Sequence, residues 1–121
     1  MFWNRKRTVQ NQYEVEYLQN ERELNAMGFQ IRTLVNAISI KNQACKMYIP
    51  ESQEYKTTSD EALELKKKLL KLMGEYTTKR KLVMSMLETY KEHFVLLDKD
   101  RVVPLTAKQL VENTIRYKKG K

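Results

Sequence analysis

Residues 62–97 read ALELKKKLLKLMGEYTTKRKLVMSMLETYKEHFVLL. Apolar side chains recur in this stretch in a heptad-compatible register, at steps of three, four or seven residues: Ala62, Leu65, Leu69, Leu72, Tyr76, Val83, Met86, Tyr90 and Leu97. This spacing lines one face of an α-helix. Thr58 and Glu61 have the spacing of a capping box, which marks a helix start. We therefore predict a long helix over residues 59–97.

An earlier stretch carries a second apolar stripe, formed by Leu24, Met27, Ile31, Leu34, Ile38 and Cys45. The helix should end near Tyr48, because Pro50 cannot donate a helical hydrogen bond and pushes the residue before it out of the α region. We predict a helix over residues 8–47. The same register places Tyr13, Tyr17 and Asn20 on the seam, so the first third of this helix should have a more polar contact face.

Two helices of about 40 residues, each about 55 Å long, should fold back on each other when a short polar loop joins them. The expected product is an antiparallel hairpin with a coiled-coil-like seam. Counting from the loop pairs residue i with roughly residue 106 − i, which places His93 near Tyr13. Gly28 and Gly74 then fall at similar depth, so either the helices approach closely there or the two glycines are incidental.

A third, shorter helix is indicated after Pro104. Thr106 and Gln109 have capping-box spacing, and Leu105 with Leu110 has the spacing of a hydrophobic staple. We predict a helix over residues 107–117 whose apolar face, Leu110, Val111 and Ile115, folds against the open end of the hairpin. The predicted fold class is all-α, with one domain over residues 8–117, a basic aromatic arm at 1–7 and a basic tail at 118–121.

Composition indicates the charge of the partner, the redox compartment and the relation to membranes. The chain has 121 residues and a formal net charge of +8, which favours an anionic partner. Cys45 is the only cysteine, so no intrachain disulfide can form and a reducing, cytoplasmic compartment (or the inside of a particle) is expected. No stretch approaches the roughly 18 consecutive apolar residues of a membrane span, so integral membrane association is not expected.

No catalytic constellation emerges from the sequence. The phosphate-cradling motif G-x-x-x-x-G-K-[ST] and the nucleophile elbow G-x-S-x-G are both missing. The hairpin register separates Cys45 from His93 by about 48 Å, too far for a nucleophile and its base. No histidine, cysteine or carboxylate cluster has metal-ligand spacing. We predict no enzyme activity, no catalytic residues, no cofactor and no metal.

Clusters of basic residues are candidates for contact with anions or nucleic acid. They comprise Arg5, Lys6 and Arg7 in the arm, Lys66, Lys67, Lys68 and Lys71 along the second helix, and Arg116, Lys118 and Lys119 near the C-terminus. Lys79, Arg80 and Lys81 follow on the same helix and, with Lys66, Lys67, Lys68 and Lys71, form a basic ridge. Such a ridge could follow a phosphate backbone without sequence preference. The alternative interpretation is a solvated helix face that serves solubility alone.

Apolar side chains outside the two stripes are candidates for docking. They are Val15, Leu18, Phe29, Ile40, Leu63, Leu70 and Met84, joined by Phe2 and Trp3 in the arm. A two-helix seam and one short helix cannot cover all of them, and exposed apolar area on this scale marks an interface. We therefore expect a homo-oligomer or a subunit of a larger complex.

Two hypotheses about function follow from these features. The first is a structural or assembly protein whose basic ends contact nucleic acid or an anionic neighbour inside a larger complex. The second is a helical adaptor or inhibitor that binds a partner protein through an exposed apolar helix face.

Overall fold

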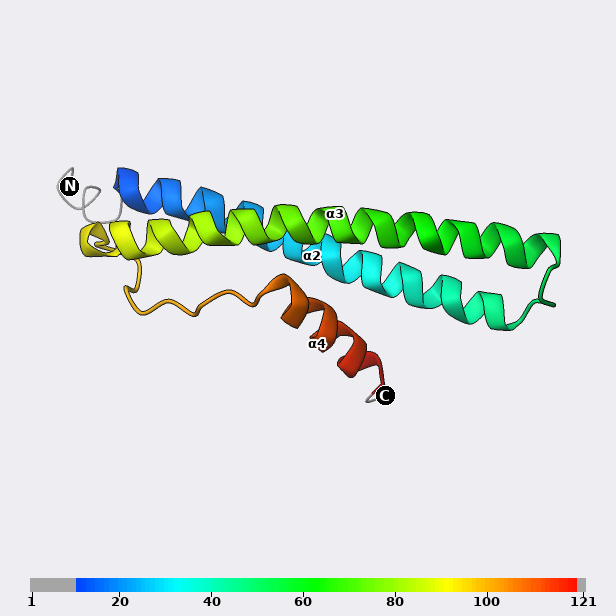
Figure 1. The fold of residues 1–121 in the computed structure, drawn as a ribbon. Coiled ribbons are helices and arrows are strands. Elements are labelled where there is room, and N and C mark those ends of the chain that lie inside the picture. The colour runs from blue at the N-terminus through cyan, green and yellow to red at the C-terminus, as the bar shows by residue number, and fades with distance from the viewer. Residues whose placement is uncertain (1–10, 120–121) are drawn as a thin grey trace, which may run out of the picture.

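The computed structural model describes residues 11–119, which form two long antiparallel helices and a short third helix (Figure 1). Helix α2 spans Gln12–Lys46 and α3 spans Gln53–Tyr90. A 3-10 turn, η1 (Lys91–His93), follows α3, and α4 spans Ala107–Lys119. No strand occurs within the described range. The predicted all-α hairpin with a short C-terminal helix is therefore confirmed.

Helix α2 begins at a capping box. The Asn11 side chain accepts a hydrogen bond from the backbone N–H of Glu14, and the Glu14 carboxylate accepts one from the backbone N–H of Asn11. The helix ends at Lys46, one residue before the predicted end. The start predicted at residue 8 is wrong for this helix, because Asn11 has an extended backbone (φ −81°, ψ 175°) and α2 begins at Gln12; residues 8–10 lie outside the described residues.

Helix α3 begins six residues earlier than predicted. Ser52 is the N-cap, and its hydroxyl accepts a hydrogen bond from the backbone N–H of Tyr55. The capping box predicted at Thr58 is wrong, because Thr58 lies within the helix and is buried. Glu51 makes the sharp turn with a φ of 75°. The polar residues after Ser52 contain no helix breaker, so the helix extends back to the first available cap.

The predicted register is confirmed to within about one turn. The rings of Tyr13 and His93 stack with centroids 4.0 Å apart. Nearer the loop, Lys41 Nζ lies 3.1 Å from Glu61 Oε1. Cys45 and His93 therefore lie at opposite ends of the hairpin, as the sequence predicted. Cys45 is half-buried rather than fully buried.

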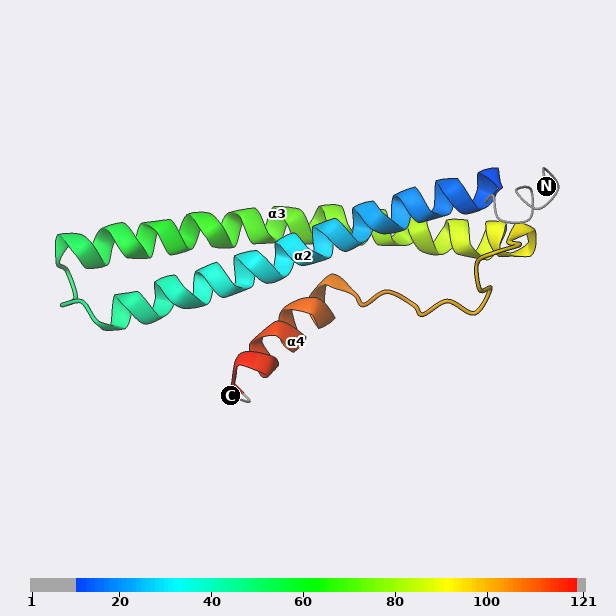
Figure 2. The same cartoon turned by 180° about the vertical axis from the view of Figure 1, so that it is seen from behind.

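The core lies along the seam and beneath α4. Its most deeply buried members are Tyr17, Leu24, Ile31 and Val83, and Leu110 of α4 is also buried. Viewed from behind, α4 lies against the middle of the hairpin and points away from it at its C-terminal end (Figure 2). The predicted position of α4 at the open end is therefore wrong, because Phe94, which contacts Tyr17 with ring centroids 5.4 Å apart, covers that end instead.

The two mid-helix glycines have different surroundings. A Cβ on Gly28 would lie 3.4 Å from Leu110 Cδ1 and 3.6 Å from Tyr76, so the missing side chain makes room for α4. A Cβ on Gly74 would meet nothing within 4 Å. Close helix approach at both glycines is therefore wrong. Ile115, predicted on the apolar face of α4, is 41% exposed.

Candidate interaction surfaces

An extended segment, residues 94–106, connects the open end of the hairpin to α4; we call it the strap. Its first residues bind the buried carboxylate of Glu14. Glu14 Oε2 accepts hydrogen bonds from the backbone N–H groups of Val95, Leu96 and Leu97 at 3.0, 2.6 and 2.7 Å. In a continued helix these groups would donate to the carbonyls of residues 91–93. The carboxylate therefore replaces three helical acceptors, and α3 ends at Tyr90 instead of the predicted Leu97.

Burial alone would raise the pKa of Glu14. The backbone N–H groups of Leu97, Asn11, Leu96 and Val95 together outweigh burial and hold this pKa below its ordinary value of 4.5. Asn11 adds a further contact to the same end of α3, since its Nδ2 donates to the His93 carbonyl at 2.6 Å.

The middle of the strap is held by an ion pair. Arg101 donates to the Glu21 carboxylate, with N···O distances of 2.7 and 3.3 Å. Tyr17 donates its hydroxyl to the same carboxylate at 2.9 Å, and the Arg101 guanidinium lies 5.4 Å from the centre of the Tyr17 ring. Charge-assisted bonds of this kind are stronger than neutral ones, so the strap is fixed at this point too.

The end of the strap binds to α3. The Tyr76 hydroxyl donates to the Leu105 carbonyl at 2.6 Å, and Arg80 Nε donates to the Pro104 carbonyl at 3.0 Å. Thr106 and Gln109 form the predicted capping box, with both hydrogen bonds present. The position of α4 is thus determined by polar contacts of the strap as well as by Leu110.

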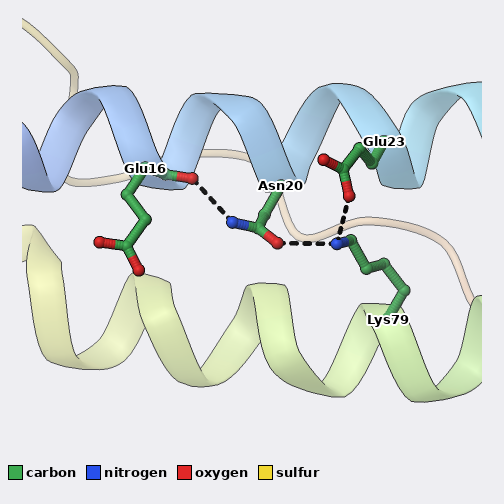
Figure 3. Close-up of polar contacts among 4 residues, drawn as sticks. All are labelled: Glu16, Asn20, Glu23 and Lys79. Carbon is green, nitrogen blue, oxygen red and sulfur yellow. Dashed lines mark hydrogen bonds and ion pairs between the residues drawn. The ribbon is translucent and has the colours of Figure 1, made fainter.

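The seam between the long helices is polar near the open end, as predicted. Figure 3 shows Lys79 of α3 reaching across to α2, where its Nζ donates to Asn20 Oδ1 at 2.7 Å and to Glu23 Oε1 at 2.6 Å. Asn20 in turn donates to the Glu16 carbonyl at 2.9 Å. Lys79 and Arg80 therefore hold the fold together, so the sequence-based view of them as part of a free basic ridge is wrong.

The remaining ridge residues are exposed. Lys66, Lys67, Lys68 and Lys71 all face solvent, and Lys67 lies 3.5 Å from Glu64 in a helical i, i+3 pair. Arg116 on α4 is also exposed. Arg5, Lys6, Arg7, Phe2 and Trp3 lie outside the described residues, as do the side chains of Lys118 and Lys119.

Five of the predicted docking residues are exposed, namely Val15, Phe29, Ile40, Leu63 and Leu70. Phe29 and Leu70 are the most exposed, at 71% and 70%. Leu18 and Met84 are only half-buried, and Leu18 packs against the core. Leu18, Phe29 and Ile40 are eleven residues apart, about three helical turns, and Leu63, Leu70 and Met84 are spaced by multiples of seven. Each long helix therefore carries exposed apolar residues, Val15, Phe29 and Ile40 on α2 and Leu63 and Leu70 on α3, which we call its outer apolar face.

A groove lies where α2 and α3 separate toward the loop, with α4 as its third wall. Its volume is about 610 Å³, and its apolar lining comes from Val35, Ile38, Leu69, Val111 and Ile115. Lys46 and Lys66 line the same groove, together with the uncharged polar residues Ser39, Asn42 and Gln43. The apolar spacing in the sequence does not predict this groove, because the groove depends on the angle between α2 and α4.

Chemically reactive groups are dispersed in the described part of the chain. Glu14 and Glu16, the carboxylates nearest to His93 in the predicted register, bind strap amides and the Tyr90 hydroxyl respectively. No group of three or more His, Cys, Asp or Glu side chains between residues 11 and 116 could hold a metal ion. Among the described helices, none is both long and apolar enough to cross a bilayer.

Comparison of the chain with protein-family models, curated proteins and solved structures gave no match.

Proposed function

We propose that this protein is a non-enzymatic structural subunit, a basic helical hairpin that packs into a larger complex through the outer apolar faces of α2 and α3. The supporting observation is the exposure of Phe29 on α2 and Leu70 on α3, at 71% and 70%. Burying apolar groups of this size against a neighbour stabilises the complex by roughly 25 cal/mol per Å² of buried area. The partner is a second copy of this chain or another protein.

The basic residues give the proposed subunit its affinity for anionic neighbours. Lys66, Lys67, Lys68 and Lys71 project from α3 into solvent, and the charged chain ends add to the same field. A nucleic acid held by such residues would bind without sequence preference, and its affinity would fall steeply with salt. Constant affinity between low and moderate salt would exclude phosphate neutralisation as the driving force.

A helical adaptor or inhibitor is the second candidate, and the same exposure of Phe29 and Leu70 favours it. The two functions differ in whether the basic residues at the chain ends contribute to binding. Replacing Arg5, Lys6, Arg7, Lys118 and Lys119 by glutamine would weaken binding by a structural subunit that contacts anions through its ends. An adaptor would keep its partner after these changes and lose it with Phe29→Asp or Leu70→Asp.

The experiment is a binding comparison on purified protein. Light scattering at tens of micromolar measures self-association of the wild type, Phe29→Asp and Leu70→Asp. Gln30→Asp and Ser85→Asp are matched controls, because they place the same charge at exposed polar positions of α2 and α3. A monomeric wild type would exclude self-association and leave a heterologous partner as the remaining form of the proposal.

A further inference from the structure

The groove between α2, α3 and α4 has the shape and polarity of a binding site for a helix. Val35 and Ile38 form its floor, while Val111 and Ile115 on α4 form one side. From Val35 to Lys46 the groove follows α2 for eleven residues, about 16 Å or three turns of a docked helix. Helix-in-groove recognition uses apolar anchors at i, i+3 or i+4, and i+7 over such a length.

The charges at the groove select the partner. Lys46 and Lys66 line it, and none of its lining residues within the described chain is acidic. Neither lysine forms an ion pair with a described residue. Complementary charge across an interface steers association, whereas like charges in apposition are costly. A partner helix with carboxylates beside its apolar stripe therefore fits this groove.

In a second copy of this chain, α2 and α3 are packed against each other, and α4 is not an acidic helix. The chain carries a net charge of +8, and α4, its most amphipathic helix, bears Lys108, Arg116, Lys118 and Lys119 against the single acid Glu112. Docking α4 of one copy into the groove of another would bring these bases toward Lys46 and Lys66. The groove is thus suited to a different protein.

We propose that the α2–α3–α4 groove binds an acidic amphipathic helix of a partner protein. The helix lays its apolar stripe on Leu69, Val111 and Ile115, above the buried Val35 and Ile38, and places carboxylates near Lys46 and Lys66. This inference rests on the proposed function, because it assigns one partner surface of the same subunit.

The test is a fluorescence anisotropy titration of the full chain with labelled synthetic helices of about 14 residues. The acidic helix carries leucines at i, i+3, i+7 and i+10 and glutamates at the flanking positions. One comparison helix replaces every glutamate by lysine. Another keeps the composition but scrambles the leucine positions. We expect the acidic amphipathic helix to bind at least tenfold more tightly than either comparison helix.

Charge-reversal variants distinguish groove binding from general attraction to a basic protein. Lys46→Glu/Lys66→Glu should weaken binding at least tenfold, and Ile115→Asp should abolish it. Lys67→Glu/Lys68→Glu makes the same charge change outside the groove lining and should have a much smaller effect. Circular dichroism verifies that each variant is folded.

Equal loss of affinity in the two charge-reversal pairs, or equal binding of the scrambled helix, would overturn the groove proposal. So would the absence of binding by the acidic helix at several hundred micromolar. The proposed function would survive these results if capture of a partner still depended on Phe29 and Leu70, because those residues lie outside the groove lining.

Discussion

Glu14 Oε2 lies 2.6 Å from the backbone nitrogen of Leu96, 82 residues further along the chain. This hydrogen bond joins the first turn of α2 to the strap, and the same oxygen also binds the amides on either side of Leu96. The buried carboxylate thus connects three features of the fold: the N-cap of α2, the end of α3 and the start of the strap.

Replacing Glu14 by glutamine removes the charge and leaves a neutral oxygen facing these amides. Hydrogen bonds to charged groups contribute more than neutral ones, so we expect the free energy of unfolding to fall by about 1–3 kcal/mol. Urea denaturation followed by circular dichroism measures the change. Glu92→Gln is the matched control, because Glu92 is exposed and near the same end of the hairpin. Equal effects of the two substitutions would contradict the role of Glu14.

The stability of the fold should also depend on pH through Glu14. Its pKa is lower in the folded state than its ordinary value of 4.5. The contribution of Glu14 is therefore fully present above pH 4.5 and is lost as the pH falls from there through the folded-state pKa. Glu23, whose pKa is lowered by the hydrogen bond and charge of Lys79, acts in the same direction. As the pH falls from 5 to below the folded-state pKa of Glu14, the free energy of unfolding should drop more in the wild type than in Glu14→Gln. Parallel plots of this free energy against pH for the two proteins would disprove the prediction.

The fold was predictable from sequence where it depends on periodic apolar spacing. The two stripes predicted the hairpin, its register and the remoteness of Cys45 from His93. Helix ends were less accurate, because Ser52 and Thr58 both have cap-forming side chains and the local sequence does not choose between them. The end of α3 depends on a carboxylate about 80 residues away in the chain, which no local pattern contains.

The candidate surfaces were predicted in part. Exposure of Phe29 and Leu70 followed from their positions off the stripes. The groove and the strap contacts were missed because they arise from tertiary angles and side-chain-to-backbone bonds. One signal was available: Asn11 and Glu14 have capping-box spacing at the predicted polar end of the seam. It identifies Glu14 as a helix-start residue but says nothing of the strap amides.

Tyr76→Phe removes the hydroxyl that donates to the Leu105 carbonyl at 2.6 Å while leaving the ring in the core. The expected loss in stability is about 0.5–1.5 kcal/mol. The more specific effect is faster hydrogen exchange in the first turns of α4, with little change in α2 near the loop. Tyr55→Phe, a half-buried tyrosine near the loop, is the control. Uniformly faster exchange along the whole chain would show that the hydroxyl does not act locally on α4.

Gly74→Ala should stabilise the protein by about 0.5–1 kcal/mol, because the methyl group enters open space and alanine favours the helix. Gly28→Ala should gain less, since its methyl group must fit 3.4 Å from Leu110. The midpoint of thermal unfolding compares the two variants. A loss of stability in Gly74→Ala would indicate that this part of α3 is covered in solution.

The proposed function depends most on the outer apolar faces of α2 and α3 being binding surfaces. The most direct measurement is quantitative affinity capture from native lysate, with and without nuclease, using wild-type protein, Phe29→Asp, Leu70→Asp and the controls Gln30→Asp and Ser85→Asp. We expect wild type and both controls to retain a defined set of partners, or a second copy, that Phe29→Asp and Leu70→Asp lose. Retention of the same partners by all five proteins would contradict the proposed function.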